Sequence, residues 1–285
     1  MKTKNIVFKN AFLLLLAGSL AVSCKKDQLA DEEQEISTAE DHSFAESTFN
    51  DVGNISDEAA SLGSLVSYKN GLDADALLSK CATVTKDTVS ENPTRIITID
   101  FGSENCAGID GRSRRGKIIV RHTGGYLDSG ATKTVSFDNY FVNDNQVTGT
   151  RSVTNKGHNA QKQLNWTVVE KGSIIMASGA GNVTWESQRN RALIEGESTL
   201  ELGDNVYSIT GNATGVNAKN NSYTANITSP LIRKMAIGCR KHFVKGSIVM
   251  KPSGKLERKI DFGNGECDNL ANVTVNGKSR QITLR

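Results

Sequence analysis

The residues whose spacing first suggests chemistry lie at Gly111–Lys117, where two glycines and a lysine have the spacing of a phosphate-binding loop. Such a loop needs Ser or Thr at the next position, to coordinate Mg²⁺, and a helix after it. The next residue is Ile118, and no helical pattern follows. A near-match ending at Gly277–Ser279 lacks the first glycine, and Asp100–Gly102 lacks the companion motifs of protein kinases. These segments therefore do not predict nucleotide chemistry.

Other catalytic and metal-binding patterns are missing from the sequence. No two of the four histidines have the spacing of metal ligands, and neither G-x-S-x-G nor H-E-x-x-H occurs. Carboxylates are abundant, but no pair is singled out as the acid and base of a glycosidase. We therefore expect a protein that is not an enzyme and uses no cofactor or metal, with glycan hydrolase as a minor alternative.

The densest cluster of cationic side chains follows the phosphate-loop lookalike and comprises Arg112, Arg114, Arg115, Lys117 and Arg121. One interpretation is a patch that binds an anionic glycan or a lipid phosphate. The favoured interpretation is a solvated loop and strand face. Nucleic acid is not expected as a partner, because the cluster lacks interleaved aromatic residues for base stacking.

Trp166 and Trp185 could form a platform for a sugar. Both, however, alternate with polar residues and so fall on the apolar face of their predicted strands. Burial in the core is therefore the favoured interpretation. If the sheet is open, the same face would line a cavity, and the protein would carry a hydrophobic or lipid ligand.

A duplicated segment organises the chain. Ile99–Cys106 returns in the same register as Ile260–Cys267, and a Gly-Lys pair follows each copy's cysteine by ten residues. Each copy also has an earlier cysteine, Cys81 or Cys239. Apart from Cys24 in the N-terminal segment, the chain has four cysteines, which allow three pairings if the protein is exported to an oxidising compartment. The repeat selects Cys81–Cys106 and Cys239–Cys267, and defines duplicated bridged units at 81–118 and 239–282.

The N-terminus has the features of an export signal covering residues 1–23. Lysines precede an apolar stretch that is too short to cross a bilayer, and the run ends in Ala21-Val22-Ser23-Cys24. This run resembles a bacterial lipobox, with Ala21 in place of the usual leucine. The resemblance implies acylation of Cys24, palmitate included, and stable anchoring in the outer membrane, at its periplasmic or cell-surface face. An ordinary secretory signal is the alternative.

Charge is segregated along the chain. Residues 24–58 contain two lysines and eleven acidic residues, a net charge of −9, and the rest of the mature chain is +9. We interpret residues 24–45 as an acidic flexible tether. Apolar residues at spacings of three and four, from Phe49 to Leu62, predict one or two short helices within 46–80, interrupted near Gly53 and packed on the body.

From residue 81 to 285, apolar residues alternate with polar ones, and turn residues recur about every ten positions. This pattern predicts an all-β domain, since one apolar face per strand is typical of an antiparallel sheet. The predicted fold is a large, curved antiparallel meander, a half-barrel-like sheet with short N-terminal helices. A β-sandwich, or two related sandwiches, is the alternative.

The run Asp100–Ile118, with Phe137–Tyr140 and Ile227–Leu231, resembles a family of uncharacterised Bacteroidetes lipoproteins. That resemblance implies an exported lipoprotein and no particular activity. We therefore predict a monomeric, outer-membrane-anchored binding, adhesion or structural module.

Overall fold

The structure is a computed structural model that describes residues 23–61, 78, 81–87, 94–125, 127–199 and 201–284, with side chains of the helix described for residues 36–60. The predicted signal peptide, apart from Ser23, and most of the segment 62–80 lie outside the described residues.

The described residues form one helix, α1 (Ser23–Ser61), and a single 14-stranded sheet. A short 3-10 helix, η2 (Leu202–Asp204), lies between two of the strands. The strands are β1 (Thr83–Lys86), β2 (Arg95–Asp100), β3 (Cys106–Ala107), β4 (Ser113–His122), β5 (Thr132–Val142), β6 (Asn145–His158), β7 (Leu164–Ile175), β8 (Asn182–Glu195), β9 (Val206–Val216), β10 (Ser222–Lys234), β11 (Lys245–Pro252), β12 (Arg258–Asn264), β13 (Leu270–Val275) and β14 (Lys278–Thr283).

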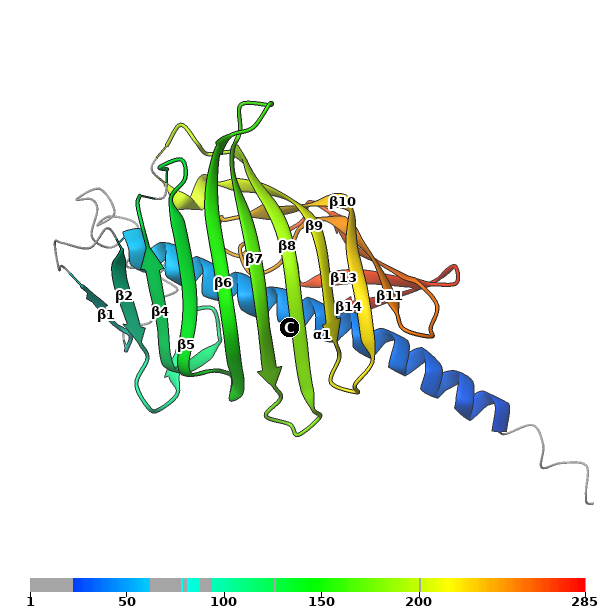
Figure 1. Ribbon diagram of the computed structural model, residues 1–285. Coiled ribbons are helices and arrows are strands. Elements are labelled where there is room, and N and C mark those ends of the chain that lie inside the picture. Colours follow the sequence, from blue (N-terminus) through cyan, green and yellow to red (C-terminus); the bar gives the residue numbers. More distant parts are fainter. Residues whose placement is uncertain are drawn as a thin grey trace, which may run out of the picture.

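The sheet is an antiparallel meander. Strands pair in chain order from β1 to β14, and only the two-residue β3 lies off this path, as a branch on β4. The sheet curves around α1, which crosses the strands on the concave side (Figure 1). The edge strands β1 and β14 are not paired with each other, so the sheet stays open. The predicted curved antiparallel meander is therefore confirmed, and the sandwich alternative is wrong.

Helix α1 is a single helix of 39 residues that is deeply enclosed by the sheet. Its apolar residues Phe49, Val52, Ile55 and Ala59 are fully buried, and so are most of its polar residues after position 37. Its N-terminal part projects beyond the sheet (Figure 1). No stretch of helix in the described part of the chain is long and apolar enough to cross a membrane.

Two expectations about this segment differ from the structure. Residues 24–45, the predicted flexible tether, are helical, and residues 38–45 are largely buried because polar side chains among them find partners in the β9–β10 turn. The helix also passes through Gly53 without interruption. A methyl group at Gly53 would lie 3.0 Å from the guanidinium of Arg151, so the glycine makes room for that side chain.

The core lies between α1 and the concave face of the sheet. The ring of Phe49 stacks on Trp185 with centroids 5.3 Å apart. It lies so close to Gly172 of β7 that any side chain there would overlap the ring. Trp166 and Trp185 are each 1 % exposed, as the core interpretation of both predicted. Burial of large aromatic and aliphatic side chains of this kind contributes about 1.5–3 kcal/mol each.

Candidate functional site in the charged interior

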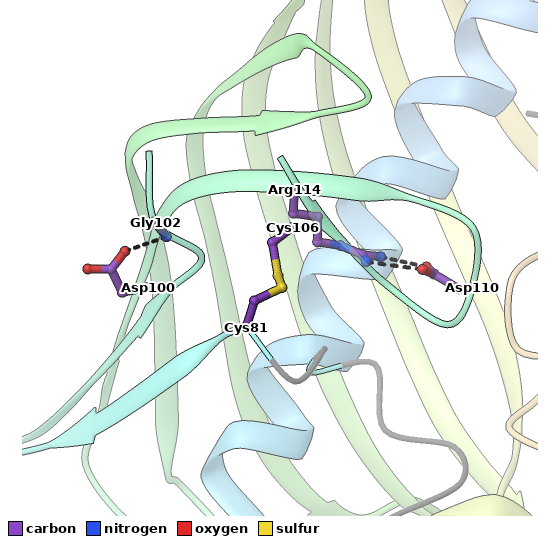
Figure 2. Close-up of a disulfide and its surroundings, with 6 residues drawn as sticks. All are labelled: Cys81, Asp100, Gly102, Cys106, Asp110 and Arg114. Carbon is purple, nitrogen blue, oxygen red and sulfur yellow. Dashed lines mark hydrogen bonds and ion pairs between the residues drawn. A yellow bond between two sulfur atoms is a disulfide. The ribbon is translucent and has the colours of Figure 1, made fainter. Parts of the chain in front are cut away.

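Acidic side chains of α1 pair with cationic side chains of the sheet in the interior. The Asp51 carboxylate accepts hydrogen bonds from Arg114 at 2.8–3.2 Å and lies 3.0 Å from Nη1 of Arg112. Arg112 also donates to the Ser47 hydroxyl at 2.6 Å. Arg114 is fully buried, and although burial opposes its charge, Asp51 raises its pKa above the ordinary value. One carboxylate of the helix thus contacts two arginines at the start of β4, and Asp110 of the preceding turn also pairs with Arg114, at 2.5 Å (Figure 2).

Two further carboxylates of α1 form similar contacts. Glu46 lies 2.9 Å from the guanidinium of Arg189 in β8 and 3.3 Å from Nε2 of His42. Burial alone would raise the pKa of Glu46, but Arg189 and His42 outweigh burial and lower this pKa to about 2. Asp57 pairs with Lys133 of β5, and also lies 3.7 Å from Arg191.

These pairs explain the charge segregation of the sequence. Outside α1, the described residues include seven buried arginines, six of them in strands and Arg112 just before β4: Arg112, Arg114, Arg151, Arg189, Arg191, Arg233 and Arg258. The acidic residues of α1 lie among them. Unpaired buried charges are costly, so the acidic helix and the basic sheet compensate each other. Most of the cationic interior thus has its anionic partner within the same chain.

The predicted cationic patch does not form one surface. Arg112 and Arg114 point inward to α1, so the favoured interpretation of a solvated face is wrong for both. Arg115, Lys117 and Arg121 lie on the opposite face, because successive residues of a strand alternate between faces. Arg115 pairs with Asp144, and Lys117 with Asp100 at 3.0 Å.

The two predicted disulfides are present and have equivalent places. Cys81–Cys106 spans 5.9 Å between Cα atoms, and Cys239–Cys267 spans 4.7 Å. Each bridge joins a cysteine before the first strand of a hairpin, β1 or β11, to a cysteine after the second, β2 or β12. Both bridges therefore close the open end of a β-hairpin.

The Asp-Phe-Gly turns are also equivalent. The Asp100 carboxylate accepts a hydrogen bond from the backbone N–H of Gly102 at 2.8 Å (Figure 2). Asp261 accepts from Gly263 at 3.1 Å. The φ angles of the glycines are +80° and +89°, a left-handed conformation that favours glycine. The aspartate–glycine hydrogen bond thus recurs in both copies, at the end of β2 in the first and at a register shift within the last residues of β12 in the second.

The Gly-Lys pairs, by contrast, are not equivalent. Gly116 and Lys117 lie within β4, where Lys117 is the register partner of Asp100. The register partner of Asp261 is Asn272 of β13. Gly277 and Lys278 instead lie at the β13–β14 turn. Equal spacing in sequence therefore does not mean equal position here, because the first copy contains the additional strand β3.

A small cavity lies beside the second bridged unit. It is bounded by α1 at Ser43, Glu46, Ser47 and Asn50, by Arg233 of β10, and by a second group of residues, Lys241, His242, Phe243, Phe262 and Leu284. Its volume of about 20 Å³ has room for about one water molecule. Neither of its cationic residues, Arg233 and Lys241, is a candidate from the sequence, because the α1 residues that complete the cavity lie nearly 200 positions earlier in the chain.

The alternation pattern could have found part of this interior. Arg189 and Arg191 share the parity of Val183 and Trp185 in β8, and all four are buried. Charged residues on an apolar strand face require buried partners, and α1 supplies an acidic one for Arg189. The alternation does not indicate which acidic residue of the chain pairs with Arg189.

No group of three or more His, Cys, Asp and Glu side chains among the described residues is placed to hold a metal ion. Comparison with family models, curated proteins and solved structures finds no match for this chain.

Proposed function

We propose that the protein is a lipid-anchored, non-enzymatic binding or structural module of the bacterial outer membrane. The observation that supports this proposal is that α1 and its ion pairs fill the concave face of the sheet. A typical pocket for a small molecule has a volume of hundreds of Å³. The cavity beside α1 is far smaller, so a partner of ordinary size would meet the outer surface of the body.

The start of α1 at Ser23 bears on how the anchor would hold the body. Cys24 lies at the tip of the projecting helix, and the described burial begins near residue 36. At 1.5 Å per residue, the intervening helix is about 18 Å long. Acyl chains on Cys24 would therefore be joined to the body by a helix instead of a flexible tether.

The anchoring proposal is tested by metabolic labelling with an alkyne palmitate in a bacterial host that processes lipoproteins. We expect the wild-type chain to carry the label and to fractionate with the outer membrane. Cys24→Ala should lose the label and become soluble while it keeps both disulfides. An unlabelled wild-type chain in the soluble fraction would instead indicate an ordinary secretory signal.

The binding proposal is tested by pull-downs from glycan libraries and envelope extracts with the lipidated protein, and size-exclusion chromatography checks the expected monomer. Specific recovery of a glycan, lipid or envelope protein supports a binding role. Recovery of nothing above background leaves only the structural role. Turnover of a glycan by the pure protein would contradict the proposal.

The alternative of a hydrophobic-ligand carrier makes a different prediction. Because α1 covers Trp185 and the neighbouring concave face, a ligand there would have to displace the helix. Mass spectrometry of a native extract should then find a lipid bound to the protein, and amide exchange in α1 should change when the lipid is removed.

A further inference from the structure

Arg233 differs from the other buried arginines near α1 in lacking a carboxylate partner. It is 5 % exposed, and its Nε and Nη2 atoms donate to the backbone carbonyl of Arg240 at 3.3 and 3.1 Å. Among the described residues, no carboxylate forms an ion pair with it. Burial and the nearby Arg191 lower the pKa of Arg233 to about 10, although the more distant Asp51 carboxylate acts in the opposite direction, whereas the direct pair with Asp51 keeps the pKa of Arg114 above its ordinary value.

Two polar atoms on the walls of the same cavity also lack partners. Nε2 of His242 and the hydroxyl of Ser43 are buried without a hydrogen-bond partner among the described residues. Burial, followed by Lys241 and Arg112, lowers the pKa of His242 to about 3. Its imidazole is therefore neutral at physiological pH and has one N–H to donate.

We propose that this cavity binds a single oxyanion group, a carboxylate or a phosphate, through Arg233, Lys241, His242 and Ser43. Unpartnered buried donors are rare in native proteins and call for a specific explanation. Here a guanidinium, an ammonium, an imidazole and a hydroxyl border one cavity, a set of donors that suits an oxyanion.

The size of the cavity restricts how the ligand binds. A volume of about 20 Å³ holds about one oxygen atom of the oxyanion, so the rest of the ligand would occupy the mouth of the cavity. Phe243, Phe262 and Leu284 provide an apolar wall beside the cations. Glu46 also borders the cavity, but its charge is engaged by Arg189 at 2.9 Å. The site thus suits an anionic group attached to a partly apolar molecule.

This inference goes beyond the proposed function and holds whether or not Cys24 is acylated. The first experiment measures thermal unfolding of the purified mature protein, with disulfides intact, in sodium phosphate and in sodium chloride of equal ionic strength. Acetate serves as the carboxylate probe. We expect a saturable rise in Tm with at least one of the two oxyanions and none with chloride, since a ligand that binds only the folded state stabilises it.

Two variants test the residues. Arg233→Met keeps the volume of the side chain and removes the uncompensated charge, so its Tm without oxyanion should equal or exceed that of the wild type. Its affinity for the oxyanion should fall about tenfold or more. Lys241→Met, at an exposed position, should also weaken binding. Lys219→Met, at an exposed position in the β9–β10 turn, is the matched control and should bind as the wild type does.

A second readout follows the imidazole of His242 directly. Its ¹⁵N signal, assigned with His242→Gln, should shift on titration with phosphate in the wild type and stay unchanged in Arg233→Met. A Tm response that is equal in wild type and Arg233→Met, or no saturable response with either oxyanion, would mean that the cavity holds only a buried water molecule and would overturn the proposal.

The sources of the oxyanion are distinguished by flotation with vesicles. For this arm, Cys24→Ala removes the acyl anchor while the cavity stays intact. Flotation with phosphatidylglycerol but not phosphatidylcholine vesicles, lost in Arg233→Met, would identify a lipid headgroup. Response to inorganic phosphate without vesicle binding would identify a soluble anion.

Discussion

In the first bridged unit, the arginines that follow the disulfide reach α1 and share the carboxylate of Asp51. Beside the second bridged unit, Arg233 and Lys241 border a cavity and have no carboxylate of their own among the described residues. The two hairpins are closed by equivalent disulfides and begin their turns with the same aspartate–glycine hydrogen bond. Similar local sequence thus supports two different roles: Asp51 of α1 pairs directly with the arginines of the first unit, whereas Glu46, the helix carboxylate beside the second, pairs with Arg189 instead of Arg233 or Lys241.

The largest expected effect tests the anchoring of the first unit. Asp51→Asn leaves Arg112 and Arg114 buried with Asp110 as their one remaining carboxylate among the described residues, and should cost about 3–4 kcal/mol of unfolding free energy. Urea denaturation measures the loss. Asp144→Asn, which removes the exposed partner of Arg115, is the control and should leave stability unchanged. Equal effects of the two substitutions would contradict the anchoring of this unit by α1.

Removal of either disulfide should lower the free energy of unfolding by a similar amount, but the two removals should differ in their effect on oxyanion binding. Cys81→Ser with Cys106→Ser and Cys239→Ser with Cys267→Ser open loops of nearly equal length, with sequence separations of 25 and 28. The chain-entropy relation gives about 3.5 kcal/mol for each. Only the loss of the second disulfide, Cys239–Cys267, should weaken the response of Tm to oxyanions. A weaker response after loss of the first pair would show that the two units are coupled through α1.

Acid should lower the free energy of unfolding by protonating Glu46, the helix carboxylate beside the second unit. Its pKa of about 2 in the folded protein lies below the ordinary value of 4.5, so its ionised form stabilises the fold above pH 4.5. This stability is lost as the pH falls from about 5 to about 2, and amounts to about 3 kcal/mol. Glu46→Gln should flatten the acid limb of a stability–pH profile, whereas the exposed control Glu186→Gln should not.

Alanine substitutions of four glycines test which positions of the two units are structurally equivalent. Gly102 and Gly263 should respond alike, whereas Gly116 and Gly277 should not. A methyl group at Gly116 would overlap the carbonyl of Asn139, whereas Gly277 has open space, so Gly116→Ala should be much the more destabilising. Gly102→Ala and Gly263→Ala, at left-handed positions with room for a methyl group, should each cost about 1–2 kcal/mol. Chemical denaturation of the four variants compares them. A large difference between Gly102→Ala and Gly263→Ala would contradict the equivalence of the turns.

Much of the fold could be predicted from local patterns. Alternation of apolar residues predicts the antiparallel sheet, and the repeated Asp-Phe-Gly segment predicts both disulfides, because each copy places its two cysteines on either side of a β-hairpin. The helix was predicted only in part. Its apolar spacing from Phe49 onward was visible, but its acidic first half has the composition of a solvated tether, and only contact with the sheet buries it.

The candidate site could be predicted less well. Arg112 and Arg114 were recognised as part of a cationic cluster, but strand alternation and the curvature of the sheet turn these two inward and the other three outward. The cavity brings together side chains from α1, β10, the β10–β11 connection and β12. Such a set depends on long-range packing, which leaves no periodic pattern along the chain.

By itself, the sequence determined the antiparallel sheet, the pairing of the cysteines in the body and the opposite charges of the N-terminal segment and the rest of the chain. Only the tertiary structure decided that these charges meet. The free energy of a buried charge depends on whether a partner lies within a few ångströms. That distance is set by how the sheet curves around the helix, so the same residue type is neutralised at Arg114 and left available at Arg233.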